Sequence, residues 1–337
     1  PFDKAAKKIV IVGDLAKDGN TGDHGSSWVK RGDPDNVLQV AEERFGDRVT
    51  FVGTDEACSK RFEIASADAV IAVVGMRYAD EGEYVADTGL MSGGDRKDSL
   101  GLHDEDIRLI ELLGSLNKER TAVVLIGGNM LMLDPWYDCV NGILMAYYPG
   151  VRGGEAIIET LFGDNNPGGK LPFVIVRDEK DLPQVDWKAE EQYYGYYHGY
   201  RRLDKEGKLP RLPYGFGLSY TNFTLNDVRL ENADADHAVF SANITNTGER
   251  SGSETAQLYI GFRDSAVDRP VRTLADFRRV YLAPGESKNA TLTVNKSDLA
   301  YYDEEKEKFI EEDIGYTAYI GNCNDKNSLT EIPFIFA

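Results

Sequence analysis

The chain has 337 residues, with 57 acidic and 38 basic side chains and a net charge of −19. This length is sufficient for two domains with separate hydrophobic cores. The strong negative charge argues against nucleic acid or an anionic membrane surface as a partner, and it fits a neutral substrate. No apolar run approaches the length of a membrane span.

The three cysteines, Cys58, Cys139 and Cys323, lie far apart in the chain. Their spacing matches neither a disulfide framework nor a metal-binding pattern, and no two histidines have metal-ligand spacing. We therefore expect no metal and no cofactor. The few cysteines favour a reducing compartment, and so the cytoplasm over secretion. Because the chain opens almost directly on a strand without a starting methionine, we expect it to be a piece of a longer protein.

The first half alternates short apolar runs with amphipathic stretches. Strands are expected at residues 7–14, 49–54, 67–76, 121–128 and 142–150, and helices at residues 35–46, 102–117 and 153–163. Strands alternating with helices predict an α/β domain with a parallel sheet covered on both faces. Ligands of such sheets sit beyond the carboxyl ends of the strands.

The second half loses helical periodicity from about residue 212. Its short alternating runs predict an antiparallel β-sandwich. The charged, tyrosine-rich stretch before it is interpreted as an irregular linker, and its aromatic run at 193–200 as packing rather than a sugar-binding platform. The expected domains are residues 1–176, a linker at 177–215 and residues 216–337. The sandwich strands are expected at residues 225–235, 237–248, 253–262, 277–287, 288–299 and 315–323.

One acidic, glycine-rich stretch, YADEGEYVADTGLMSGGDR at residues 78–96, directly follows the third apolar run. A general acid needs a carboxyl group kept protonated by burial or by a second carboxylate, and a loop can carry such a group to a cleft. Composition alone leaves two interpretations open, a solvated acidic loop and a catalytic carboxylate.

Two further stretches carry a family resemblance, YPGVRGGEAIIETLFGDNNPGGKLP and LPYGFGLSYTNF. Together with residues 66–102 they resemble β-glucosidases of glycoside hydrolase family 3, and the last third resembles the fibronectin type III-like domain of those enzymes. The resemblance covers nearly the whole chain in order. It implies a mostly parallel six-stranded α/β sandwich domain followed by an all-β fibronectin-like sandwich. It also implies a (β/α)8 barrel domain, on the same gene or on a second chain, that carries the nucleophile.

The resemblance points to Glu81 as the catalytic acid/base. In similar enzymes this residue is a glutamate followed by glycine on a long loop, upstream of a GDR segment, and here Glu81 precedes Gly82 with Arg96 downstream. Glu83 is the alternative, because an inserted stretch separates the EGE motif from GGDR. Arg96 is expected either to position the loop or to pair with an acidic neighbour.

A loop at residues 19–29 resembles a segment that borders the active site in this family. His24 and Trp28 are therefore expected to line the subsite for the leaving part of the substrate, because a flat ring stacks on a sugar face. The alternative is a tryptophan buried in the core.

The function implied is part of a retaining exo-β-glycosidase, a β-glucosidase in the first place, that acts on a β-glucoside or a short β-linked oligosaccharide. The chain alone is expected to be inactive. Two alternatives stay open: a non-catalytic carbohydrate-binding or assembly module, and a β-xylosidase of the same family. A homo-oligomer is left open as well.

Overall fold

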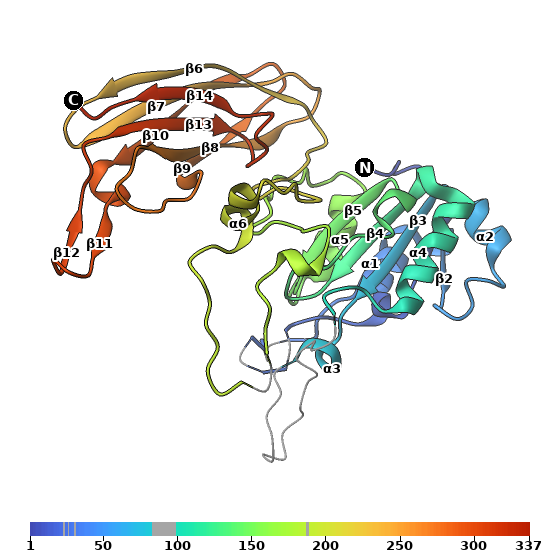
Figure 1. Ribbon diagram of the computed structural model, residues 1–337. Helices are drawn as coiled ribbons and strands as arrows, with labels where there is room; N and C mark the ends of the chain where they lie inside the picture. Colours follow the sequence, from blue (N-terminus) through green and yellow to red (C-terminus); the bar gives the residue numbers. More distant parts are fainter. Residues whose placement is uncertain (23, 26, 30–31, 83–98, 187–188) are drawn as a thin grey trace. The chain divides into compact units, whose positions relative to one another are not determined.

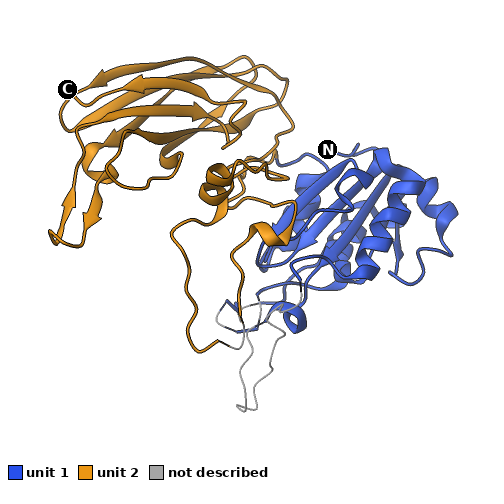
Figure 2. Cartoon of the chain, viewed as in Figure 1, with its two compact units in different colours: residues 1–165 blue, residues 166–337 orange. Residues whose placement is uncertain are grey.

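The computed structural model describes residues 1–22, 24–25, 27–29, 32–82, 99–186 and 189–337 (Figure 1). The chain divides into two compact units, residues 1–165 and residues 166–337 (Figure 2). The domain boundaries expected from the sequence stay a prediction. In the described part of the chain, no helix is both long enough and apolar enough to cross a membrane.

The first unit is built on a parallel sheet of five strands in the order β2-β1-β3-β4-β5. Every residue of β1, β3 and β4 is buried, as expected for strands covered on both faces. The strands are β1 (Ile9–Val12), β2 (Val49–Val52), β3 (Ala69–Gly75), β4 (Thr121–Ile126) and β5 (Gly142–Tyr147).

Helices pack on both faces of this sheet (Figure 1). Alternate strand residues such as Ile11 and Ile71 form one core with α1 and α5, which lie against each other. On the other face, α4 buries Leu109, Ile110 and Leu113 and packs against α2, β3 and β4. The helices are α1 (Val37–Phe45), α2 (Arg61–Ala65), α3 (Tyr78–Glu81), α4 (Asp104–Asn117) and α5 (Gly153–Leu161).

The predicted fold class is confirmed for this unit, and all five strands expected from the apolar runs are present. The described sheet has five strands rather than the six implied by the resemblance. The extended residues after α5 do not join it: Ile175 pairs only with Leu212, in an isolated antiparallel bridge. The short helices α2 and α3 were not predicted, because four or five residues show no clear helical period.

The second unit contains two antiparallel sheets, β10-β7-β6 and β14-β13-β8-β9, with a small β11-β12 pair. Inward-facing residues such as Phe240, Leu258 and Ile320 are fully buried and form the core that both main sheets share. The strands are β6 (Phe223–Ala233), β7 (His237–Asn246), β8 (Gly252–Arg263), β9 (Thr273–Leu282), β10 (Ser287–Asn295), β11 (Tyr301–Asp303), β12 (Lys308–Ile310), β13 (Gly315–Gly321) and β14 (Thr330–Phe334).

The predicted β-sandwich is confirmed, but the predicted linker is not irregular throughout. It contains a helix, α6 (Gly199–Glu206), which buries Leu203 and ends at Gly207 in the left-handed conformation. Asp204 of this helix accepts a hydrogen bond from Arg272 at 2.8 Å, so α6 is tied to the β-sandwich. The apolar pattern of the sequence did not predict this helix, because Leu203 is its one buried side chain.

The aromatic run at 193–200 divides into two parts. Tyr200 packs against Tyr214 and Tyr259, and its hydroxyl accepts a hydrogen bond from the backbone N–H of Leu274. Tyr193 is 90% exposed. The packing expected from the sequence therefore holds for Tyr200 and is wrong for Tyr193.

Candidate active site

The carboxylate of Glu81 lies where three neighbouring strands of the parallel sheet end. Glu81 is the last residue of α3, which follows β3. Its Oε1 accepts a hydrogen bond from the backbone N–H of Gly128, just beyond β4, at 2.6 Å. The same oxygen accepts a second bond from the hydroxyl of Tyr148, just beyond β5, at 2.8 Å. The sheet thus presents one carboxylate and two donors at its carboxyl edge, where α/β folds place their ligands.

The short helix that carries Glu81 is held by its own polar contacts. Asp80 accepts a hydrogen bond from the backbone N–H of Arg77 at 2.7 Å and lies 3.0 Å from Nε2 of His103. The Arg77 side chain also donates to Asp18 at 3.2 Å. These contacts connect α3 to the start of α4 and to the segment after β1, and so they fix the backbone from which the Glu81 side chain extends.

Two consecutive glycines allow the carboxylate and the phenol to approach β4. At Gly127, which has φ of 159°, an added Cβ would lie 3.5 Å from Oε1 of Glu81. At Gly128 an added Cβ would lie 2.7 Å from the Tyr148 ring, closer than real Cβ atoms approach other heavy atoms. The tyrosine ring therefore occupies the space that any other residue at 128 would fill.

Three aromatic rings lie beside the same helix. His24 stacks on Tyr78 of α3, with ring centroids 4.5 Å apart, and its ring lies 4.9 Å from that of Trp28. The structure thus brings together the two residues expected to line a sugar subsite. Trp28 is 40% exposed, which excludes the alternative of a core tryptophan. Tyr78, three residues before Glu81, was not predicted to belong to this group.

Two of the predicted site residues lie outside the described part of the chain. Arg96 and the alternative acid/base Glu83 both fall within residues 83–98. The choice between Glu81 and Glu83 therefore stays a prediction. The sequence reading also missed Tyr148 and Gly128. Their signals were the YYPG and GG that end the fifth and fourth apolar runs, but the contact of these residues with Glu81 depends on the order of the strands in the sheet.

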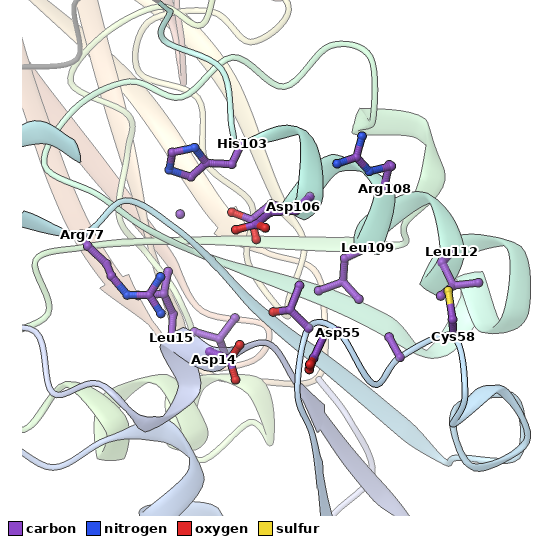
Figure 3. A pocket seen from close by; sticks show the side chains of 15 residues that line it. Asp14, Leu15, Asp55, Cys58, Arg77, His103, Asp106, Arg108, Leu109 and Leu112 are labelled. Carbon is purple, nitrogen blue, oxygen red and sulfur yellow. The ribbon is translucent and has the colours of Figure 1, made fainter. Parts of the chain in front are cut away.

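A separate cleft of about 430 Å³ opens beyond the carboxyl ends of β1, β2 and β3 (Figure 3). The strand order reverses here, because β2 and β3 lie on opposite sides of β1. Asp106 enters from α4 and faces Asp14 and Asp55, while Leu109 supplies apolar surface. Glu81 is not one of its lining residues. Across the described residues, no three His, Cys, Asp or Glu side chains are grouped so that they could hold a metal ion.

Burial of Asp106 raises the pKa of its carboxyl group to about 6, against a contribution from the Gly75 backbone N–H that lowers it. A carboxyl group whose pKa is higher in the folded than in the unfolded chain favours folding most at low pH. This contribution is complete below the unfolded pKa of 3.8 and is lost as the pH rises through about 6.

Replacing Asp106 by asparagine should therefore stabilise the protein at pH 7.5, because the substitution removes a poorly solvated charge. The pKa difference sets an upper limit of about 3 kcal/mol on the gain in unfolding free energy, and partial exposure reduces it to about 1–2 kcal/mol. The gain should disappear near pH 4. Urea midpoints from pH 4 to 8 measure it, with Asp104→Asn as the control, since Asp104 is an exposed acid in the same first turn. A variant no more stable than wild type at pH 7.5 would contradict this account of Asp106.

Comparison with known proteins identifies both parts of the chain. The family model described as the glycosyl hydrolase family 3 C-terminal domain matches residues 1–220. The model of a fibronectin type III-like domain matches residues 254–323.

Individual relatives agree with these matches. The chain is 31% identical to an exo-α-(1→6)-L-arabinopyranosidase of Bifidobacterium breve over 94% of its own length, and 31% identical to a thermostable β-glucosidase B of Acetivibrio thermocellus over 89%. It spans 42% and 41% of the length of these two proteins. A crystal structure of a β-glucosidase from Bifidobacterium adolescentis superimposes with a TM-score of 0.87 at 27% identity, covering 99% of this chain and 51% of that one. The chain therefore belongs to glycosyl hydrolase family 3, and it consists of the family's C-terminal domain followed by a fibronectin type III-like domain.

Proposed function

We propose that this chain is the acid/base-bearing part of a retaining exo-β-glycosidase, a β-glucosidase in the first place, whose nucleophile lies on a (β/α)8 barrel outside the chain. The observation that carries the proposal is the position of Glu81, whose carboxylate two donors hold at the carboxyl edge of the sheet. The family membership, and the β-glucosidases among the similar proteins, support the reaction type.

In this mechanism Glu81 acts twice. It first donates its proton to the glycosidic oxygen as the C1–O bond breaks, while the barrel carboxylate bonds to C1 and forms a glycosyl-enzyme. The ionised Glu81 then takes a proton from water, whose oxygen attacks C1 and releases the barrel carboxylate. Retaining enzymes place these two carboxyl groups about 5–5.5 Å apart.

The rings beside α3 suit the leaving part of the substrate. Exposed Trp28 lies against His24, and His24 stacks on Tyr78, three residues before Glu81 in the same helix. We place the aglycone there, because a sugar or aryl ring stacks on the flat face of an aromatic ring. Arg96 keeps the two roles expected from the sequence, positioning the loop or pairing with an acidic neighbour.

An assay of the chain with and without its barrel tests the proposal. The 337-residue chain alone should not hydrolyse p-nitrophenyl β-glucoside, because one carboxylate cannot carry out both displacements. The complete enzyme, in which the barrel lies on the same gene or on a second chain, should hydrolyse it, and Trp28→Ala in the complete enzyme should raise KM more than it lowers kcat. Turnover by the isolated chain would contradict the proposal. Parallel assays with p-nitrophenyl β-xyloside and p-nitrophenyl α-L-arabinopyranoside determine which sugar the enzyme prefers.

A further inference from the structure

We propose that Tyr148 is a positioning residue for the acid/base: its hydroxyl holds one oxygen of the Glu81 carboxylate, so that the other oxygen carries the proton that is transferred. The inference rests on the proposed function, in which Glu81 is the acid/base. The family resemblance assigned no role to Tyr148, and the inference rests on the contacts that this residue makes with Glu81 and Gly128.

The backbone before Tyr148 is irregular in a way that re-aims its side chain. Along β4 and β5, Leu125 pairs with Met145 but Ile126 pairs with Tyr147, so β5 has one extra residue at this point. Tyr147 has a φ of 54°, a conformation rare for an aromatic residue. Bulges and strained residues of this kind cluster at functional sites, where they redirect a side chain. Here the side chain that follows the irregularity is Tyr148.

The redirected ring packs on the backbone of the neighbouring strand. The backbone N–H of Gly127 donates to the carbonyl of Tyr147 at 3.2 Å, which joins the two strand ends. The Tyr148 ring then covers the Cα of Gly128, where an added Cβ would lie 2.7 Å from both Cζ and the hydroxyl oxygen. The ring is half-buried, so its hydroxyl is held in one place before any substrate arrives.

Both donors reach the same carboxylate oxygen. Gly128 N–H and Tyr148 Oη–H each bond to Oε1 of Glu81, whereas Oε2 accepts no hydrogen bond from a described residue. A proton on Oε1 would compete with these two donors, so the acidic proton resides on Oε2. Glu81 can therefore give up and regain the proton at Oε2 without breaking the contacts that hold the side chain.

The test is a double-mutant cycle in the complete enzyme, which includes the barrel. Tyr148→Phe keeps the ring on Gly128 and removes only the hydroxyl. A hydroxyl bonded to a carboxylate is a charge-assisted hydrogen bond, so its loss should lower kcat about 10-fold for phenyl β-glucoside, a poor leaving group, with KM little changed. For 2,4-dinitrophenyl β-glucoside, whose phenolate leaves without a proton, kcat/KM reports only the first displacement and should fall less than about 2-fold. Tyr302→Phe, the same change at an exposed tyrosine of β11, is the matched control.

In the Glu81→Ala background, Tyr148→Phe should have no further effect, because the group that it positions is gone. An equal loss in both backgrounds, or a loss equal for both substrates, would show a general structural role and overturn the inference while the proposed function stands. A loss below about 2-fold with phenyl β-glucoside would also overturn it. If Glu81→Ala itself did not distinguish the two substrates, the role of Glu81 in the proposed function and the inference would both fall.

Discussion

Glu81→Ala should lower kcat/KM for phenyl β-glucoside by about 10³-fold in the complete enzyme with its barrel, and for 2,4-dinitrophenyl β-glucoside by less than about 10-fold. The phenolate of the first substrate leaves only with a proton, whereas the second leaves as a stable anion. The difference between the two losses therefore measures proton donation separately from folding and binding. Steady-state kinetics over a series of substituted aryl glucosides gives this difference as a slope against leaving-group basicity.

The matched control is Glu83→Ala, two residues further along the chain. If Glu81 is the acid/base, Glu83→Ala should reduce both substrates by similar, small factors. A steep dependence on leaving group in Glu83→Ala, with a shallow one in Glu81→Ala, would transfer the role to Glu83. The contacts with Gly128 and Tyr148 would then serve only to anchor the base of the loop.

Gly75→Ala should lower the free energy of unfolding by more than about 4 kcal/mol, because the added methyl group overlaps the neighbouring strand at the centre of the parallel sheet. Gly75 ends β3 with a φ of 137°, and an added Cβ would lie 1.9 Å from the carbonyl oxygen of Ile126 on β4. Because the contacted atom belongs to the backbone of β4, no side chain can move aside, and β3 and β4 would have to separate. This is the pair of strands that brings Glu81 to Gly128.

Gly46→Ala separates backbone strain from steric overlap. Gly46, which ends α1, has a φ of 56°, but nothing lies within 4 Å of an added Cβ. Its ψ of −134° lies outside the left-handed helical region, in a conformation that favours glycine, so the substitution should cost about 1–3 kcal/mol. Urea midpoints of the two variants beside wild type measure both effects. Equal costs would show that the overlap with Ile126 is relieved by a small shift of the strands.

The sequence predicted the sheet of the first unit because its strands are continuous apolar runs. The run that ends at Gly75 placed the acidic segment at a carboxyl end, and the family resemblance then pointed to Glu81 within that segment. The contact with Tyr148 was not predictable in the same way. It requires that β5 lie next to β4 and that Tyr147 adopt a positive φ, and neither property follows from local composition.

In the second unit, apolar patterns predicted the buried strands but not the exposed elements. β8 has a completely buried run and was predicted, whereas β12, with the sequence KFI, exposes its phenylalanine and has no apolar period to detect. The α6 helix is charged along most of its length, and buried Leu203 and the Asp204–Arg272 ion pair hold it in position. Tertiary contacts, rather than propensity, decide such elements.

The measurement that tests the central claim most directly is the product that Glu81→Ala forms from 2,4-dinitrophenyl β-glucoside in the presence of azide. Without Glu81 the first step still proceeds, but no base activates water, so the glycosyl-enzyme accumulates. Azide needs no base: its nitrogen bonds to C1 as the bond from C1 to the barrel carboxylate breaks. We predict faster turnover and a glucosyl azide of β configuration, observed by NMR, because two inversions restore the original configuration. No acceleration by azide, or an α-glucosyl azide, would contradict the assignment of Glu81 as the acid/base of a retaining glycosidase.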